Sequence, residues 1–128
     1  MTHPDLMGQA LQFRTAMSQH CGMFSPSICE TQARLIEEEY EEFTDAYLVA
    51  ADHIQNTRAR EEALKELADL VYVAFQFAAA AGWELDEALD RVHKSNMSKL
   101  VDGKPLKRGD GKVLKGPNYK PPYLTDLV

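Results

Sequence analysis

The sequence predicts an all-α protein, a four-helix bundle followed by an extended C-terminal arm. Apolar residues recur at three- and four-residue spacing in four successive segments between residues 5 and 99, which is the period of amphipathic helices. After residue 99 the helical period stops, and the chain contains two Asp-Gly turns and four prolines. We therefore expect a single domain over residues 1–128, with a helical core at about 5–99 and a basic arm at 100–128.

The first two helices are predicted from apolar spacing and from a capping signal. Residues 5–20 read as a short amphipathic helix. A longer helix begins at Ser27, because Ser27 and Glu30 have the spacing of a capping box, and it ends near His53. We expect the apolar stripe of this long helix to face the core. The stripe consists of Ile36, Tyr40, Phe43, Tyr47 and Ala50.

The last two helices are bounded by a polar cap and by a glycine. Asn56 or Thr57 caps a third helix that ends at Gly82. Because this helix is apolar nearly all round over residues 64–81, we expect it at the centre of the bundle. A fourth helix covers about residues 85–99.

The arm is predicted to be extended, with one local fold. Lys104–Arg108 and Lys112–Lys115 could pair as a short hairpin across Gly109–Gly111. The alternative is a solvated tail without fixed structure.

Charge and cysteine content limit the class of protein. From Lys94 onward the chain has eight Lys and Arg against three Asp, a net +5, so the formal net charge of −6 leaves −11 on the preceding residues. This uneven charge argues against nucleic-acid binding, which needs a continuous basic face, and suits a polyphosphate ligand. We see no signal peptide and no membrane span, and Cys21 and Cys29 lack pairing or metal-site spacing. We expect a cytoplasmic protein.

Two groups of carboxylates carry the chemistry. The second helix contains Glu37-Glu38-x-x-Glu41, and the third contains Glu66-x-x-Asp69. Residues three or four apart lie on one helix face. The pair Glu38 and Glu41 can therefore coordinate one ion together, and so can the pair Glu66 and Asp69. An acidic run of this kind is more often a solvated helix face, and the second pair is what argues against that interpretation.

Glu66 and Asp69 lie where the third helix becomes apolar on every side. Carboxylates there are partly buried, and an unpaired buried charge is costly. Lys65 is adjacent in sequence, but we expect it to point elsewhere. A bound metal is the simplest resolution, and ligands that are all oxygen select Mg²⁺ or Mn²⁺.

The same stretches resemble a known family. LIEEEYEEF followed by EALKELADLVY resembles the paired EExxE…ExxD signature of the MazG-like, all-α NTP pyrophosphatase superfamily. RVHKSNMSKL and DGKVLKGPNYKPPYL are similar to the ending of a phosphoribosyl-ATP pyrophosphohydrolase-like subgroup, and the resemblance spans about residues 30–124. It implies a Mg²⁺-dependent enzyme, in which Mn²⁺ can substitute, that hydrolyses a (d)NTP to the monophosphate and pyrophosphate.

The resemblance also implies roles for the carboxylates. Glu38, Glu41, Glu66 and Asp69 would be the metal ligands, and the catalytic pair would be Glu37 and Glu38. Glu37 would be a further ligand or the group that orients the attacking water. That water would attack the α-phosphorus in line.

Substrate contacts are expected at the end of the fourth helix and in the arm. Lys94 and Lys99 are less than two helical turns apart, and with Asn96 they could reach phosphate groups or the base. Tyr119 of the arm could close over the nucleotide. The alternative is that these lysines only cap a helix C-terminus, where they are favoured in any case.

Several alternatives remain open at this stage. The substrate could be phosphoribosyl-ATP, or the chain could be a non-catalytic nucleotide-binding or helical interaction module. A di-iron bundle needs two Glu-x-x-His pairs, whereas only Asp90-x-x-His93 approaches that pattern. The small core and the family resemblance together suggest a homodimer or a homotetramer.

Overall fold

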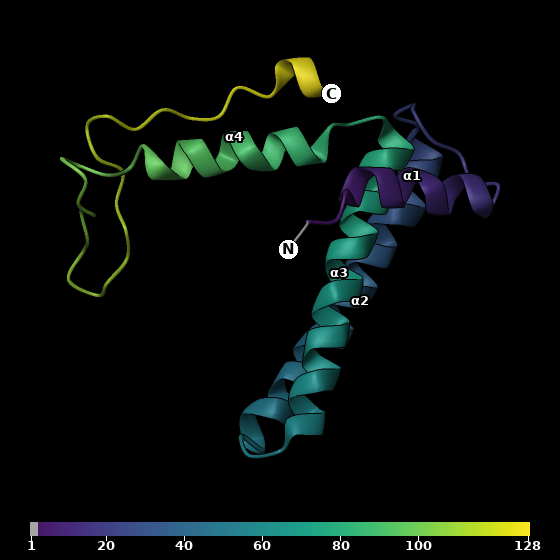
Figure 1. Ribbon diagram of the computed structural model, residues 1–128, viewed down its shortest axis with the longest axis horizontal. Coiled ribbons are helices and arrows are strands. Elements are labelled where there is room, and N and C mark those ends of the chain that lie inside the picture. The colour runs from purple at the N-terminus through teal and green to yellow at the C-terminus, as the bar shows by residue number, and fades with distance from the viewer. Residues whose placement is uncertain (1–2) are drawn as a thin grey trace. The chain divides into compact units, whose positions relative to one another are not determined.

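The computed structural model describes residues 3–128, which contain four α-helices and no β-strand (Figure 1). The elements are α1 (Leu6–Ala16), α2 (Pro26–Asp52), α3 (Thr57–Ala81), α4 (Leu85–Met97) and a final 3-10 turn, η1 (Thr125–Leu127). The predicted all-α fold with four helices is confirmed. The chain forms two compact units that divide between Trp83 and Glu84. No helix within residues 3–128 is long and apolar enough to cross a membrane.

α2 and α3 pack side by side as a helical hairpin, the largest contact of the first unit (Figure 1). The predicted ends of α3 are confirmed: the Asn56 side chain accepts a hydrogen bond from the Ala59 amide at 3.2 Å, and Gly82 adopts a left-handed φ of 77°. The predicted capping box at Ser27 is wrong, because α2 starts at Pro26 and Ser27 already lies in its first turn. Proline is favoured there, since the first helical amides have no partner within the helix.

A buried polar contact fixes α1 on α3. The Arg14 side chain donates from Nε to the His20 carbonyl at 2.6 Å and from Nη1 to the Gln76 amide oxygen at 3.3 Å. Gln76 in turn donates to the Ala10 carbonyl at 3.5 Å. Arg14 is only 2% exposed, and a buried guanidinium is stable only when its donors are satisfied. These bonds therefore hold both the end of α1 and the start of the following connection.

The rotation of α2 about its axis differs from the prediction. Tyr40 and Tyr47 of the expected core stripe are 58% and 53% exposed. Gln32 is buried and Glu39 is half-buried instead. The prediction that the whole stripe faces the core is therefore wrong for the two tyrosines. The reason is that α2 directs polar side chains toward α3. The apolar pattern of α2 alone does not reveal this orientation.

Within the first unit, other helices do not enclose α3, although the sequence predicts it at the centre of the bundle. There α3 packs on α2 and α1, and one side of it stays open. Leu64, Leu67 and Val71, called here the α3 stripe, are 67%, 40% and 43% exposed. Two helices cannot enclose a third on all sides, so part of its apolar surface lies in solvent.

In the second unit the C-terminal strap, residues 120–128, runs back along α4 (Figure 1). The Ser95 hydroxyl donates to the Lys120 carbonyl at 2.7 Å, and the Glu84 amide donates to the Leu127 carbonyl at 3.1 Å. Leu127 is buried. The alternative of a solvated tail is therefore wrong for the strap.

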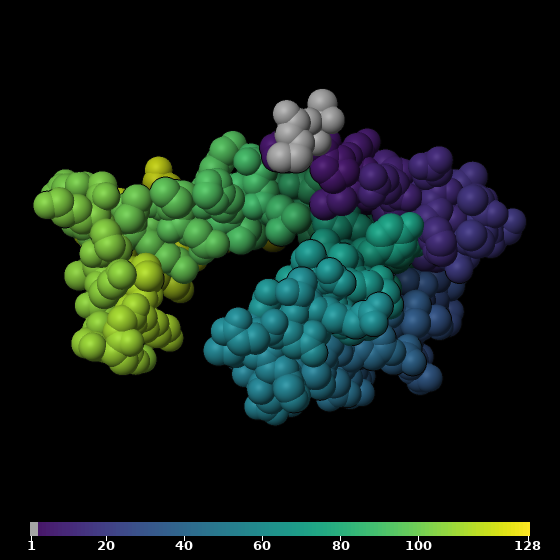
Figure 2. All heavy atoms as spheres, turned by 60° about the horizontal axis from the view of Figure 1, so that its bottom comes forward, coloured from purple at the N-terminus to yellow at the C-terminus, as the bar shows by residue number. Residues whose placement is uncertain are grey.

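The predicted hairpin of the arm is confirmed. Leu106–Arg108 pairs with Lys112–Leu114, through a bond from the Arg108 amide to the Lys112 carbonyl at 2.8 Å and one from the Leu114 amide to the Leu106 carbonyl at 2.7 Å. Within the second unit, this yellow-green hairpin projects from α4 and the strap (Figure 2). Its turn is Gly109–Gly111, where Asp110 binds the side chain of Arg108.

Arg91 is the main polar anchor of the strap. It donates to both carboxylate oxygens of Asp126, at 2.6 and 3.0 Å, and to the Tyr123 carbonyl at 2.9 Å. These bonds from Arg91 hold the pKa of Asp126 below its usual range. A carboxyl whose pKa is lowered by folding contributes stability above its unfolded pKa, and this contribution is lost as the pH falls through its folded pKa.

We expect Arg91→Ala to release the strap from α4, because three hydrogen bonds to it are lost at once. The protection of the amides of residues 120–128 against hydrogen exchange, relative to the intrinsic rate at the same pH, should fall below that of the unmodified chain. Acidification below the pKa of Asp126 should lower this protection in the same direction. Arg108→Ala is the matched control, since Arg108 also binds a nearby aspartate but does not contact the strap. Equal exchange in the two variants would contradict the anchoring role.

Candidate metal centre

Three carboxylates from two helices meet on the inner side of the α2–α3 hairpin. One oxygen each from Glu39 and Glu42 of α2 and from Glu66 of α3 lie within 4.8 Å of one another. Glu66 is only 7% exposed, Glu39 is half-buried and Glu42 is exposed. We call these three residues the acidic cluster. It is closed on the Glu66 side and open to solvent at Glu42.

Two oxygens of the acidic cluster are buried without any partner. Glu39 Oε2 and Glu66 Oε2 are inaccessible to solvent and accept no hydrogen bond within residues 3–128. An unsatisfied buried acceptor costs free energy, more so when it is charged. Both residues contribute an oxygen to the acidic cluster, so the chemistry of the donor set fits a divalent cation with oxygen ligands.

Repulsion within the acidic cluster is strong. The pKa of Glu42 is raised above its ordinary value, first by the charge of Glu39, then by burial and by Glu66. A carboxylate whose pKa is raised by neighbouring negative charges favours a bound proton or a nearby cation. This is the electrostatic environment in which a metal ion is bound most favourably.

Lys65 supplies part of the missing positive charge, so the prediction that it points elsewhere is wrong. Its Nζ lies 2.8 Å from Asp69 Oδ2 and 3.4 Å from Glu66 Oε1. These two contacts hold the pKa of Lys65 above its usual range. Lys65 and Asp69 are four residues apart, which places them on the same side of α3. Because its side chain is 61% exposed, Lys65 can move aside without loss of packing.

The acidic run of α2 contains the EExxE spacing in two overlapping registers. The first is Glu37-Glu38-x-x-Glu41 and the second is Glu38-Glu39-x-x-Glu42. Glu37, Glu38 and Glu41 are exposed on α2, whereas the structure brings Glu39 and Glu42 together with Glu66. Sequence reasoning therefore missed Glu39 and Glu42, and the structure favours the second register.

The positions of the residues around the axis of α2 could have distinguished the two registers. Glu39 is seven residues after Gln32, and residues seven apart lie on nearly the same side of a helix. Gln32 is buried in α2. A search for the inward face of α2 that allowed polar residues would have found Gln32 and Glu39 together.

The remaining predicted site residues are distributed over both units. Asp69 is half-buried one turn after Glu66, in the first unit. The predicted substrate contacts lie in the second unit, where Lys94 forms an ion pair with Asp90 at 2.8 Å. Those contacts are Lys94, Asn96, Lys99 and Tyr119, the last with Lys115 Nζ 4.7 Å from the centre of its ring. Asn96 is exposed and Lys99 is half-buried.

The comparison with known families defines the class of this chain. A family model described as phosphoribosyl-ATP pyrophosphohydrolase matches residues 10–96, which include all of α2 and α3 and so the acidic cluster. The chain is therefore a pyrophosphohydrolase that acts on phosphoanhydride bonds, a MazG-like enzyme as its acidic motifs predicted. It belongs to the phosphoribosyl-ATP pyrophosphohydrolase family. No curated protein matches the chain significantly.

We expect Mg²⁺ or Mn²⁺ to stabilise the chain against heat, because an ion that binds only the folded state shifts unfolding by mass action. The Tm of the metal-free protein should rise by several degrees with millimolar Mg²⁺. Glu66→Gln should abolish this rise without lowering the Tm of the metal-free protein, since the substitution removes an uncompensated charge. The control is Glu61→Gln, at an exposed position of α3; a metal response in Glu66→Gln equal to this control would rule out the acidic cluster as the metal site.

Proposed function

We propose that this chain hydrolyses the bond between the α- and β-phosphates of a nucleoside triphosphate group, with Mg²⁺ held by the acidic cluster, and releases pyrophosphate. The observation that carries the proposal is the pair of buried, unpartnered oxygens of Glu39 and Glu66 beside Glu42. Phosphoribosyl-ATP comes first as the substrate, because the family description names it. The (d)NTPs expected from the sequence carry the same triphosphate and come second.

In this proposal the acidic cluster holds the metal, and the neighbouring members of the two motifs complete the site. Glu38 lies one turn before Glu42, and Asp69 lies one turn after Glu66, so each can reach an ion or a water bound beside the cluster. When bound, the metal would neutralise the phosphates and lower the pKa of a bound water. Glu38 is our candidate for orienting that water, because it lies four residues before Glu42 on the same face of α2, where an exposed carboxylate outside the acidic cluster can contact a water bound beside it.

The substrate contacts that the sequence predicts at residues 94–119 stay proposals. Lys94 would exchange its exposed partner Asp90 for a phosphate oxygen, and an exposed ion pair of this kind costs little to break. Asn96, Lys99 and Tyr119 remain proposed substrate contacts on the basis of the family resemblance. Their role is positioning and charge stabilisation, which is most of what a phosphoryl-transfer enzyme provides.

We also propose that a second copy of the chain covers the α3 stripe. Leu64, Leu67 and Val71 expose apolar surface on one side of a helix that is otherwise packed. Exposed apolar surface of this kind marks an interaction site. If the α3 stripes of two copies packed against each other, α2 and α3 of both copies would form a four-helix core. The sequence predicts a four-helix bundle within a single chain. The proposed assembly is a homodimer.

The activity is tested by product analysis with phosphoribosyl-ATP and a panel of NTPs and dNTPs. We expect pyrophosphate and the monophosphate, and no product without metal. Glu39→Gln and Glu42→Gln should each lower kcat about a hundredfold or more, because a lost ligand removes charge stabilisation in the transition state. Glu37→Gln and Glu41→Gln are the matched controls and should retain most of the activity.

Three outcomes of this assay would contradict the proposal in different ways. Release of orthophosphate would mean that a different bond is cut. Strong loss of activity in Glu37→Gln and Glu41→Gln, with Glu39→Gln and Glu42→Gln unaffected, would restore the first register of the motif. Absence of turnover with every substrate would leave a nucleotide-binding module without catalysis.

The homodimer is tested by sedimentation equilibrium. We expect Leu64→Glu to convert the dimer to a monomer, because it places a charge in the middle of an apolar contact. The control is Leu48→Glu, a leucine of α2 that is similarly exposed, at 53%, and lies outside the α3 stripe. A monomeric unmodified chain, or a Leu64→Glu variant that stays dimeric, would exclude this interface.

A further inference from the structure

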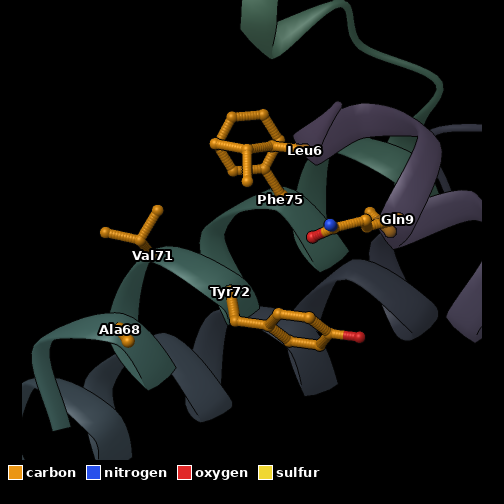
Figure 3. A pocket seen from close by; sticks show the side chains of 7 residues that line it. Leu6, Gln9, Ala68, Val71, Tyr72 and Phe75 are labelled. Atoms are coloured by element: carbon orange, nitrogen blue, oxygen red, sulfur yellow. The ribbon is translucent and has the colours of Figure 1, made fainter. Parts of the chain in front are cut away.

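A groove lies between α1 and α3 in the first unit, on the side of α3 away from α2 (Figure 3). Its volume is about 370 Å³, which is within the range of small-molecule sites. The walls are apolar, and they include Leu6 of α1 and Ala68, Val71 and Phe75 of α3. Two polar groups interrupt them, the amide of Gln9 and the phenol of Tyr72. Among residues 3–128, no Asp, Glu, Lys or Arg lines the groove. Val71 also belongs to the α3 stripe, so the groove borders the surface that is proposed to contact a second copy.

A second hollow continues this groove along α1. It shares Gln9 and Tyr72 with the first hollow and adds Gln12, Phe13 and Ala16. Figure 3 shows the end of the Gln9 side chain pointing over the groove, with the Tyr72 ring on the same side of α3. The two hollows together form one trough with apolar walls, an aromatic ring and two amide side chains.

The Tyr72 ring is held in place but is not covered. Phe13 contacts it in a T-shaped arrangement, with 5.7 Å between ring centres and 86° between ring planes. Tyr72 is nevertheless 40% exposed. Tyr72 belongs to the apolar stretch, residues 64–81, whose helix was expected at the centre of the bundle, and the structure shows that part of its ring is open to a ligand. A fixed and exposed aromatic ring is a surface on which a flat ligand can stack.

The position of the trough relative to the acidic cluster fits one molecule that bridges both. Glu66, Asp69 and Tyr72 follow one another at three-residue spacing, so Tyr72 lies about 9 Å along the α3 axis from Glu66 and about 120° around the helix from it, with Asp69 midway between them. A substrate that contacts both sites has to follow this line past Asp69 around α3. A nucleotide has this order of parts, with a charged phosphate chain, a sugar and a neutral flat ring.

We propose that this trough between α1 and α3 is the subsite for the heteroaromatic base of the substrate, an inference that rests on the proposed function. The base stacks on Tyr72 against the apolar walls, which suits a neutral ring. Gln9 and Gln12 hydrogen-bond the polar edge of the base, because each amide offers both donors and an acceptor. These three residues then determine which base the enzyme prefers.

The first test measures binding without turnover. We expect the side-chain amide NMR signals of Gln9 and Gln12, assigned through Gln9→Ala and Gln12→Ala, to shift on titration with at least one of AMP, GMP, CMP and UMP. Ribose 5-phosphate should leave both signals in place, because it has no base. Equal shifts with ribose 5-phosphate, or no shift with any of the four monophosphates, would overturn the proposal.

The second test uses the hydrolysis assay. Tyr72→Leu should raise KM for the best substrate about tenfold, the loss expected for one stacking contact, and should lower kcat much less. Tyr72→Phe keeps the ring and should stay close to the unmodified enzyme. Gln9→Ala should also raise KM, whereas Gln55→Ala, at an exposed glutamine of the α2–α3 connection, is the matched control. A KM for Tyr72→Leu and Gln9→Ala no higher than that of the control would overturn the proposal.

The two tests separate failure of the base subsite from failure of the proposed function. If Mg²⁺ raises the Tm and hydrolysis proceeds, but the groove variants leave KM unchanged, the function stands and the subsite is wrong. If no substrate is hydrolysed, the amide titration still reports on base binding. If Tyr72→Leu instead converts a dimer to a monomer in sedimentation, the trough is a contact between copies and the subsite is excluded.

Discussion

The burial of Glu66 between α2 and α3 is the constraint on which the first unit depends. A carboxylate that is 7% exposed needs a counter-charge, yet its neighbours across the hairpin are Glu39 and Glu42. Among residues 3–128, Lys65 is the one basic residue that forms an ion pair with it, from the exposed side of the same helix. The helices therefore place several negative charges where apolar packing would be more stable. This arrangement is the one that the proposed binding of a cation and, through it, of a phosphate chain would use.

The rest of the first unit supports that arrangement by fixing the helices around it. Arg14 and Gln76 lock α1 onto α3 through buried hydrogen bonds, which sets the width of the trough that contains Tyr72. Glu66 and Tyr72 lie on the same helix, so rigid packing of α3 fixes the distance from the carboxylates to the aromatic ring. The proposed binding of the phosphates and of the base therefore depends on one element. The second unit is ordered by other contacts, chiefly those of Arg91 with the strap.

The features that were predicted correctly depend on residues close in sequence. The cap at Asn56, the left-handed Gly82 and the hairpin around Gly109–Gly111 each require only local bonds. The predicted start of α2 at Ser27 was too late, because proline is favoured in the first helical turn and the helix therefore begins at Pro26. The two acidic motifs were recognised as a pair, and the family match agrees with that recognition. The sequence analysis chose Glu38 and Glu41 as the ligands from α2, whereas Glu39 and Glu42 are the residues that lie close to Glu66, because the run fits the motif in two registers.

The sequence by itself determined the helical period, the ends of most elements, the family and the presence of carboxylates on two helices, because these follow from residue type and spacing along one chain. Only the tertiary structure decided which carboxylates meet, because the rotation of α2 about its axis depends on what α3 presents to it. The same holds for Lys65, which contacts Glu66 and Asp69, and for Tyr72, which is exposed rather than buried. A side chain's partners are set by the packing of neighbouring helices, which no single helix encodes.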